Sequence, residues 1–68
     1  MAITILDVPT LEGADCVRVI SSALRIVPGI VGVQVDVQRK QVVVDFDSAL
    51  INEVQVIELC RDTGYAPK

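Results

Sequence analysis

The first half of the fold is set by residues 8–17, which read VPTLEGADCV and connect an apolar strand to an apolar helix. Residues 2–8 are mostly β-branched or apolar on both faces, a pattern typical of a central strand, and Pro9-Thr10 ends that strand. After the connection, apolar residues recur at helical spacing until Pro28-Gly29, where a helix normally stops. A helix is therefore predicted over residues 15–27, with an apolar face made of Cys16, Val19, Ile20, Ala23, Leu24 and Val27.

The middle of the sequence predicts a hairpin. Valines alternate with glycine or polar residues over residues 31–37, which indicates a strand with one buried face. After the polar pair Arg39-Lys40, residues 41–46 are expected to return as the second strand, with Val42, Val44 and Phe46 facing inward. If the sheet has one open face, Ile3, Ile5 and Val43 are candidates for an apolar patch on it, which would suit a dimer or a partner protein.

A second helix is expected near the end of the chain. Asp47-Ser48 is a candidate cap for a helix over residues 49–63, because both side chains can accept from free N–H groups. The residues predicted to face inward from this helix are Val56, Ile57 and Cys60. Gly64 is expected to end the helix, and residues 65–68 leave room for only a short last strand.

The predicted element order is therefore β-α-β-β-α-β in a single domain that spans residues 1–68. Each unit is too short to cover both faces of a sheet, so the compact solution places both helices on one face. We therefore expect an α+β protein with the ferredoxin-like split βαβ fold and a four-stranded antiparallel sheet.

Composition excludes several classes of function. The formal net charge is −3 and only 3% of the residues are aromatic, so neither a basic face nor a stacking platform for nucleic acid is expected. No apolar run is long enough to cross a bilayer, and residues 1–7 do not resemble a secretory leader. We therefore expect a soluble cytoplasmic protein without membrane insertion, in which both cysteines stay reduced.

The sequence also resembles the heavy-metal-associated domain, the fold of small copper chaperones and of the N-terminal domains of copper-transporting ATPases. The resemblance covers essentially the whole chain. It rests on the element order and on segments spread along the sequence, namely Cys16-Val17, Ala23-Leu24, VPGI at 27–30, the strand at 33–37, VDFD at 44–47 and Gly64-Tyr65.

The family's metal loop reads Gly-Met-Thr-Cys-x-x-Cys, and only its second cysteine has a counterpart in this chain. That cysteine matches Cys16, whereas the family's first cysteine falls on Gly13. The resemblance therefore implies a metal ligand at Cys16 and a tyrosine beside the metal at Tyr65. The other loop positions, none of which supplies a thiol, are Thr10, Leu11, Glu12, Ala14 and Asp15.

One loop thiol limits the metal chemistry that a single chain can perform. Cu(I) favours thiolate ligands, and Zn(II) sites need three or four protein ligands. The chain has no histidine, so Cys60, Asp15 and Glu12 are the further candidate ligands, and the two carboxylates would give a weak site at most. Three sources of a second ligand stay open: Cys60, the Cys16 of a second chain, or the thiols of a partner protein.

Both cysteines also have a structural interpretation. Cys16 lies on the apolar face of its helix and is a core candidate, although its place in the first helical turn favours retained thiol chemistry. Cys60 is expected to act as a small apolar core residue. In the split βαβ fold the first helix begins, and the second ends, at the same end of the sheet, so the two cysteines are expected near each other.

The leading hypothesis is a copper-chaperone-like protein that binds a soft metal through Cys16. The second ligand would come from a homodimer that shares one ion or from a partner such as a copper-transporting ATPase. Cu(I) is the expected ion, zinc is a lesser alternative, and a chain without metal is also consistent with the sequence. The alternative function is a protein-interaction module that kept the fold and lost the metal. We expect no enzymatic activity, because no set of residues suits a catalytic site.

Overall fold

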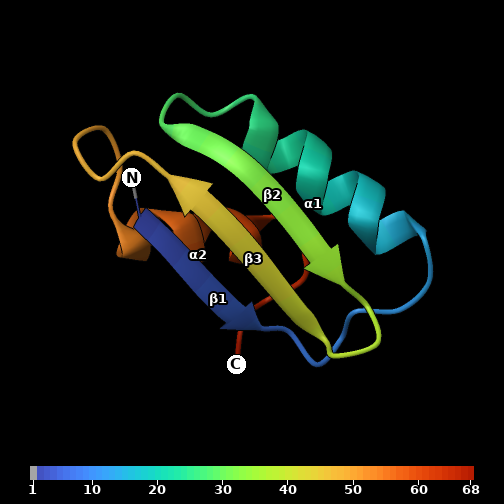
Figure 1. Ribbon diagram of the computed structural model, residues 1–68. Coiled ribbons are helices and arrows are strands. Elements are labelled where there is room, and N and C mark those ends of the chain that lie inside the picture. Colours follow the sequence, from blue (N-terminus) through green and yellow to red (C-terminus); the bar gives the residue numbers. More distant parts are fainter. Residues whose placement is uncertain (1) are drawn as a thin grey trace.

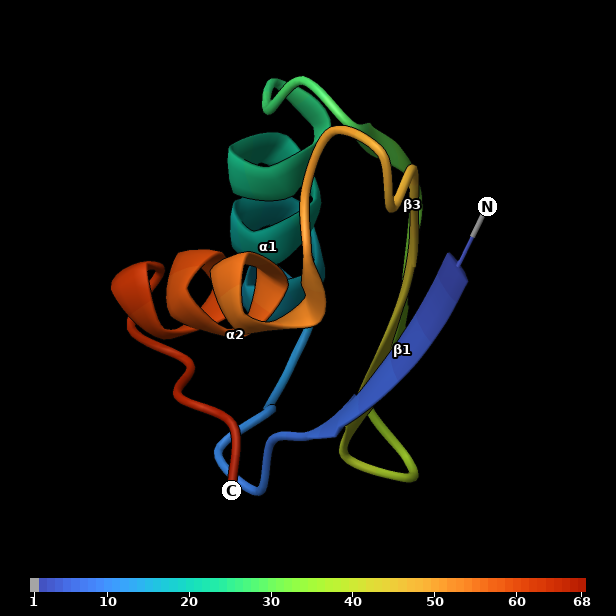
Figure 2. The same ribbon diagram turned by 90° about the vertical axis from the view of Figure 1, so that its left-hand side faces the viewer.

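An antiparallel sheet carries both helices on one of its faces. The computed structural model describes residues 2–68 and gives the elements β1 (Ala2–Asp7), α1 (Asp15–Arg25), β2 (Ile30–Asp36), β3 (Gln41–Phe46) and α2 (Glu53–Asp62). Strand β3 lies between β1 and β2 (Figure 1). Both helices lie on the same side of the sheet, and its other face is open (Figure 2). The predicted arrangement of two helices on one face of an antiparallel sheet is confirmed.

The prediction of a four-stranded sheet is wrong for residues 2–68, which form three strands. As a result β1, which was expected to be central, lies at an edge of the sheet. The last residues contact β1 through one backbone hydrogen bond, in which the Lys68 N–H donates to the Asp7 carbonyl at 2.6 Å. Residues 65–68 are few, and Pro67 lacks the N–H group that a strand ladder needs.

The core fills the space between the sheet and the helices. Its sheet side includes the predicted residues Val42, Val44 and Phe46, and Val56 and Cys60 contribute from α2. From α1, only the residues at every fourth position are buried, namely Cys16, Ile20 and Leu24. Val19, which was predicted to face the core, is 40% exposed. The buried stripe of α1 is therefore narrower than the sequence pattern suggested, and Ile57 of α2 is only half-buried.

Strand β2 contains an irregularity that changes which of its residues face inward. The pairing with β3 shifts between Ile30 and Gly32, so that Val31 is the extra residue of a β-bulge. Because one inserted residue reverses the alternation of faces, Val31 is 56% exposed although it was predicted to be buried. Beyond the bulge, Val33 is buried as predicted.

Helix α2 begins later than predicted. Asp47 caps a turn instead of a helix, because its carboxylate accepts from the Ala49 N–H at 3.0 Å. The helix starts after Asn52, whose side chain accepts from the Gln55 N–H at 2.9 Å while the Gln55 side chain accepts from the Asn52 N–H at 3.0 Å. This reciprocal capping box satisfies two N–H groups that a helix start leaves free, so it fixes the start at Glu53.

Strand β1 places a polar residue inward and two isoleucines outward. The Thr4 hydroxyl donates to the Glu53 carboxylate of α2 at 3.1 Å, which satisfies this buried side chain. Ile3 and Ile5 lie on the open face, where Val43 is the cross-strand partner of Ile5. The predicted placement of this apolar patch is therefore confirmed, and a partner that covers it stays a prediction.

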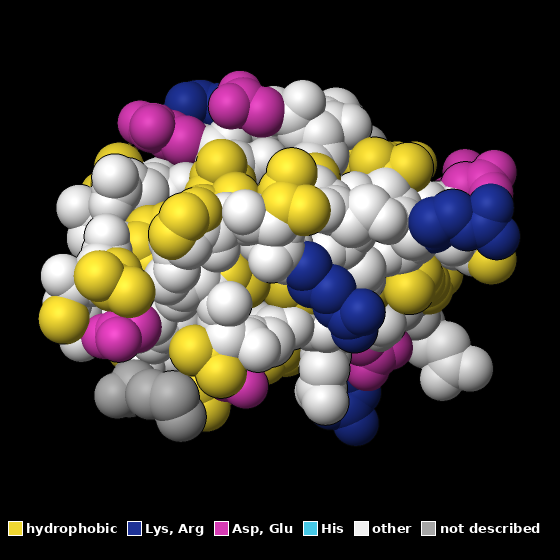
Figure 3. Space-filling view, turned by 90° about the horizontal axis from the view of Figure 1, so that it is seen from above, with side chains coloured by type: hydrophobic (Ala, Val, Ile, Leu, Met, Phe, Trp, Pro, Cys, Tyr) yellow, Lys and Arg dark blue, Asp and Glu magenta, His cyan; other side chains and the backbone are white. Residues whose placement is uncertain are grey.

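Other exposed apolar side chains lie at the end of the molecule where α1 leads into β2 and β3 leads into α2. They include Ile26 and Leu50, in the two connections. Figure 3 views this end, where hydrophobic side chains are interleaved with charged and other ones. Neither helix within residues 2–68 has the length and apolar character that crossing a membrane requires.

Candidate metal-binding loop

The connection between β1 and α1 lies at the end of the molecule that also contains the β2–β3 turn and the C-terminal segment (Figures 1 and 2). We call residues 9–15, which include Asp15 as the first residue of α1, the 9–15 loop. Most of its side chains are exposed, including the predicted site positions Thr10, Glu12, Ala14 and Asp15. Leu11 is fully buried and joins the hydrophobic core. The loop is therefore attached to the core at one point and open to solvent at most others.

Cys16 occupies the first turn of α1, as predicted, and its side chain is fully buried. Its thiol donates to the Gly13 carbonyl at 3.1 Å, so the loop lies against the sulfur. The residue before the helix is Ala14, which provides no side-chain cap for the free N–H groups of the first turn. The thiol is thus positioned at a helix start, but a metal ion reaches it only if the loop moves.

Gly13 has a backbone conformation that favours glycine. Its φ angle is +72°, in the left-handed region that side chains disfavour. A Cβ atom at this position would meet no other atom within 4 Å, so space does not exclude a side chain. A side chain at this position, where the family has its first cysteine, would therefore be disfavoured by backbone conformation and not by crowding.

Lys40 is a residue of this region that sequence reasoning missed. It lies in the β2–β3 turn, with a positive φ of 56°, and its ammonium group donates to the Leu11 carbonyl of the loop. Its own carbonyl accepts from the Val8 N–H at 2.8 Å, just after β1. The sequence indicates only a polar turn at Lys40. It does not indicate the contact with Leu11, because the two residues are 29 positions apart and meet only through the tertiary fold.

Cys60 lies in the last turn of α2 and is fully buried. Its thiol donates to the Tyr65 carbonyl at 3.3 Å, whereas the Cys16 thiol is bonded to Gly13. Burial raises the pKa of the Cys60 thiol, which favours the neutral form over the thiolate that binds metals. Both cysteines belong to one core cluster, and a ligand role for Cys60 stays a prediction. Tyr65 is half-buried and packs against the same cluster.

The donor set of one chain is too small for a closed metal site. Within residues 2–68, no group of three or more histidine, cysteine, aspartate or glutamate side chains is arranged to hold a metal ion. Glu12 and Asp15 are exposed, while Cys16 is buried. A soft ion bound at Cys16 therefore requires a donor that the 9–15 loop does not supply.

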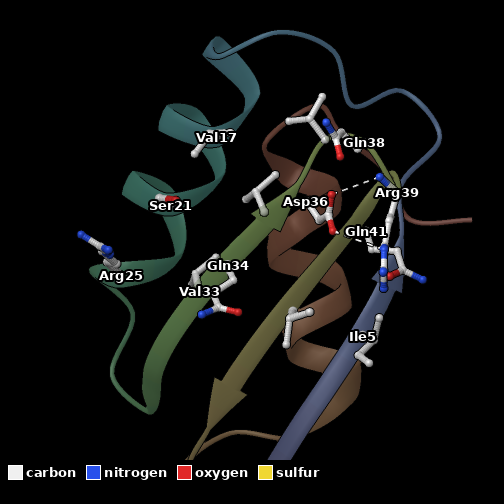
Figure 4. A pocket seen from close by; sticks show the side chains of 13 residues that line it. Ile5, Val17, Ser21, Arg25, Val33, Gln34, Asp36, Gln38, Arg39 and Gln41 are labelled. Carbon is white, nitrogen blue, oxygen red and sulfur yellow. Dashed lines mark hydrogen bonds and ion pairs between the residues drawn. The ribbon is translucent and has the colours of Figure 1, made fainter.

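A surface pocket of about 750 Å³ lies along β2 and extends to α1 and the open face of the sheet (Figure 4). Val17, Ser21 and Arg25 line it from α1, and Cys16 is not among its lining residues. At the hairpin end of the pocket, Arg39 is directed at the Asp36 carboxylate, 3.8 Å away. The pocket is therefore separate from the candidate metal loop.

Residues 5–66 match the profile of the heavy-metal-associated domain family. The match covers most of the chain and includes the whole 9–15 loop. The chain therefore belongs to the heavy-metal-associated domain family.

Solved structures of copper-related proteins have the same fold. The CopZ metallochaperone is 25% identical with a TM-score of 0.92, and the match covers 98% of this chain and 100% of that chain. A copper-binding domain of a P-type ATPase is also 25% identical with a TM-score of 0.92, covering 100% and 92%. Apo-CopP from Helicobacter pylori is 27% identical with a TM-score of 0.87, covering 98% and 100%. No curated protein matches the sequence significantly.

Proposed function

We propose that this chain carries Cu(I) as cargo, bound through Cys16 together with a thiolate from another chain. The observation that carries the proposal is the position of Cys16, in the first turn of α1 and directly after the loop of a heavy-metal-associated fold. Cu(I) is the ion of choice because it is soft and accepts as few as two thiolate ligands. A zinc site would need at least three protein ligands, which this loop does not offer.

Two sources of the second thiolate fit the donor set. In a homodimer, each chain contributes Cys16 to one shared ion. In a transfer complex, a partner with two thiols of its own holds the ion, and Cys16 is the third ligand during exchange. A copper-binding domain of a P-type ATPase is a reasonable class of partner, because such a domain shares this fold at a TM-score of 0.92.

The test is an anaerobic titration of the reduced protein with Cu(I) in the presence of a coloured Cu(I) chelator. The expected stoichiometry is roughly one ion for two chains, since linear two-thiolate coordination then uses one Cys16 from each chain. Size-exclusion chromatography of the loaded protein should show a dimer that dissociates when excess chelator removes the copper.

The matched variants are Cys16→Ser and Cys60→Ser, because both remove one buried thiol. Copper competition and dimerisation should be lost in Cys16→Ser and kept in Cys60→Ser. Tight one-to-one binding by a monomer that is lost in both variants would instead assign the second ligand to Cys60. Wild-type protein that competes no better than Cys16→Ser would leave the interaction-module function as the better explanation.

A further inference from the structure

The 9–15 loop is held closed by a small number of contacts. At its start, the Val8 N–H donates to the Lys40 carbonyl at 2.8 Å, and the Leu11 N–H donates to the Val8 carbonyl at 3.1 Å. At its end, the Cys16 thiol donates to the Gly13 carbonyl. Between these points, the Lys40 ammonium group donates to the Leu11 carbonyl. Within residues 2–68, this is the side-chain hydrogen bond that joins the loop to a distant part of the sequence.

The closed loop and the buried thiol are geometrically linked. Leu11 and Cys16 are both fully buried, and the stretch between them includes the Gly13 carbonyl that lies against the sulfur. Gly13 has the flexibility to change conformation at low cost, because glycine adopts positive and negative φ angles about equally well. A movement of residues 12–14 with Leu11 released would therefore uncover the Cys16 thiol without unfolding α1.

We propose that Lys40 is a positioning residue that keeps the 9–15 loop closed over Cys16 and so controls access to the thiol. The turn that carries Lys40 is fixed by the two paired strands that it joins and by the backbone hydrogen bond to Val8. The backbone of Lys40 is therefore held in a position from which its ammonium group reaches the Leu11 carbonyl. A charge-assisted hydrogen bond is stronger than one between neutral groups, which suits this role.

The control of thiol access in the metal-free protein does not depend on the proposed function. A role in copper transfer does rest on the proposed function, because release of Lys40 from Leu11 would be the step that lets a partner's ion reach Cys16. A partner surface that offers an acidic group to the Lys40 ammonium would favour the open loop and couple docking to exposure of the thiol.

The experiment measures the alkylation rate of each cysteine in the reduced, metal-free protein with iodoacetamide, resolved by peptide mass spectrometry. The rate at a buried thiol reports how often the structure opens around it. Lys40→Met keeps most of the unbranched apolar chain, is one atom shorter and removes the donor. Because Lys40 is exposed and water competes for its hydrogen bond, the Cys16 rate should rise about fivefold, the effect of one ordinary net hydrogen bond. Lys40→Arg keeps a cationic donor and should restore most of the protection.

Two controls separate loop opening from general loss of stability. Cys60 is buried in α2 and bonded to Tyr65, so its rate should stay unchanged unless the whole domain opens more often. Arg39→Met removes the neighbouring cation, whose side chain forms an ion pair with Asp36 and has no hydrogen bond to the 9–15 loop among residues 2–68, and it should leave both rates unchanged.

The outcomes that contradict the proposal are distinct. A Cys16 rate in Lys40→Met equal to wild type would mean that burial of Leu11 alone closes the loop. A lower rate would show that the cation acts on the thiolate by charge and not by positioning the loop. Equal increases at Cys16 and Cys60 would assign Lys40 to global stability. None of these outcomes depends on copper binding, so failure here and failure of the proposed function are distinguishable.

Discussion

At the scale of single residues, Gly13 decides how much metal chemistry one chain can perform. It stands at the position of the family's first cysteine, and a side chain there would find open space. We expect Gly13→Cys to bind Cu(I) tightly at one ion per chain, because the loop would then supply both thiolates. Because Gly13 has a positive φ, the new side chain should lower the free energy of unfolding by roughly 1–2 kcal/mol. Chelator competition and chemical denaturation measure the two effects.

Gly13→Ala is the matched control, since it introduces the same backbone strain without a thiol. It should lose the same stability as Gly13→Cys and gain no affinity for copper. The double variant Gly13→Cys/Cys16→Ser should return to weak binding. A folded Gly13→Cys protein that binds no better than its parent would mean that the 9–15 loop no longer has the shape of a metal loop.

Because of Cys60, the free energy of unfolding is expected to change with pH in the alkaline range. Burial raises the pKa of its thiol above the reference value of 9.0, so the folded chain holds this proton more tightly than the unfolded chain does. The resulting contribution to the free energy of unfolding is complete below the unfolded pKa, and it is lost as the pH rises through the folded pKa. The difference in free energy of unfolding between wild type and Cys60→Ala, measured in urea, should therefore become smaller as the pH rises above about 9. A constant difference between the two proteins across that range would contradict this.

At the scale of elements, the start of α2 depends on the capping box between Asn52 and Gln55. Asn52→Ala should lower the free energy of unfolding by about 1 kcal/mol, because it leaves first-turn N–H groups without an acceptor. In a domain of this size that corresponds to a fall in Tm of about 4–8 °C, which calorimetry resolves. Asn52→Asp keeps the acceptor and should stay close to wild type. An equal loss in both variants would assign the effect to packing of the preceding loop.

The elements that the sequence predicted correctly are those whose patterns are local. Strand β3 has the predicted bounds and inward residues because its alternation is uninterrupted. The bulge at Val31 and the late start of α2 were missed for different reasons. A bulge leaves no signal in a stretch where valines alternate with small or polar residues. The start of α2 does have a signal, because Asn52 and Gln55 have the spacing of a capping box, but Asp47-Ser48 also has the residue types of a helix cap.

The same distinction between local and tertiary information applies to the candidate site. Cys16 was placed correctly at a helix start because the loop and helix are adjacent in sequence. The burial of its thiol and its bond to Gly13 depend on how the loop folds back, which no spacing rule gives. Leu11 precedes α1 and Lys40 follows β2 in the sequence, so only the assembled fold brings the two residues into contact.

At the scale of the whole molecule, the core draws apolar residues from every strand and both helices, so folding should not require metal. This differs from small zinc domains, in which metal binding supplies the folding free energy. Thermal unfolding in the presence of a strong chelator should be cooperative, with the same helical signal as in untreated protein. A circular dichroism spectrum that gains most of its helical signal only after copper is added would contradict this expectation.

The edge position of β1 has a consequence for amide hydrogen exchange. In an antiparallel pair, successive residues point their N–H groups alternately toward and away from the neighbouring strand. The bonds of Val8 to Lys40 and of Lys68 to Asp7 show that even-numbered positions face β3 and odd-numbered ones face outward. The amides of Thr4 and Leu6 should therefore exchange slowly, while those of Ile3, Ile5 and Asp7 exchange at rates close to those of an unfolded chain. One strand would thus show protection with a period of two, which a fourth strand pairing with β1 would erase.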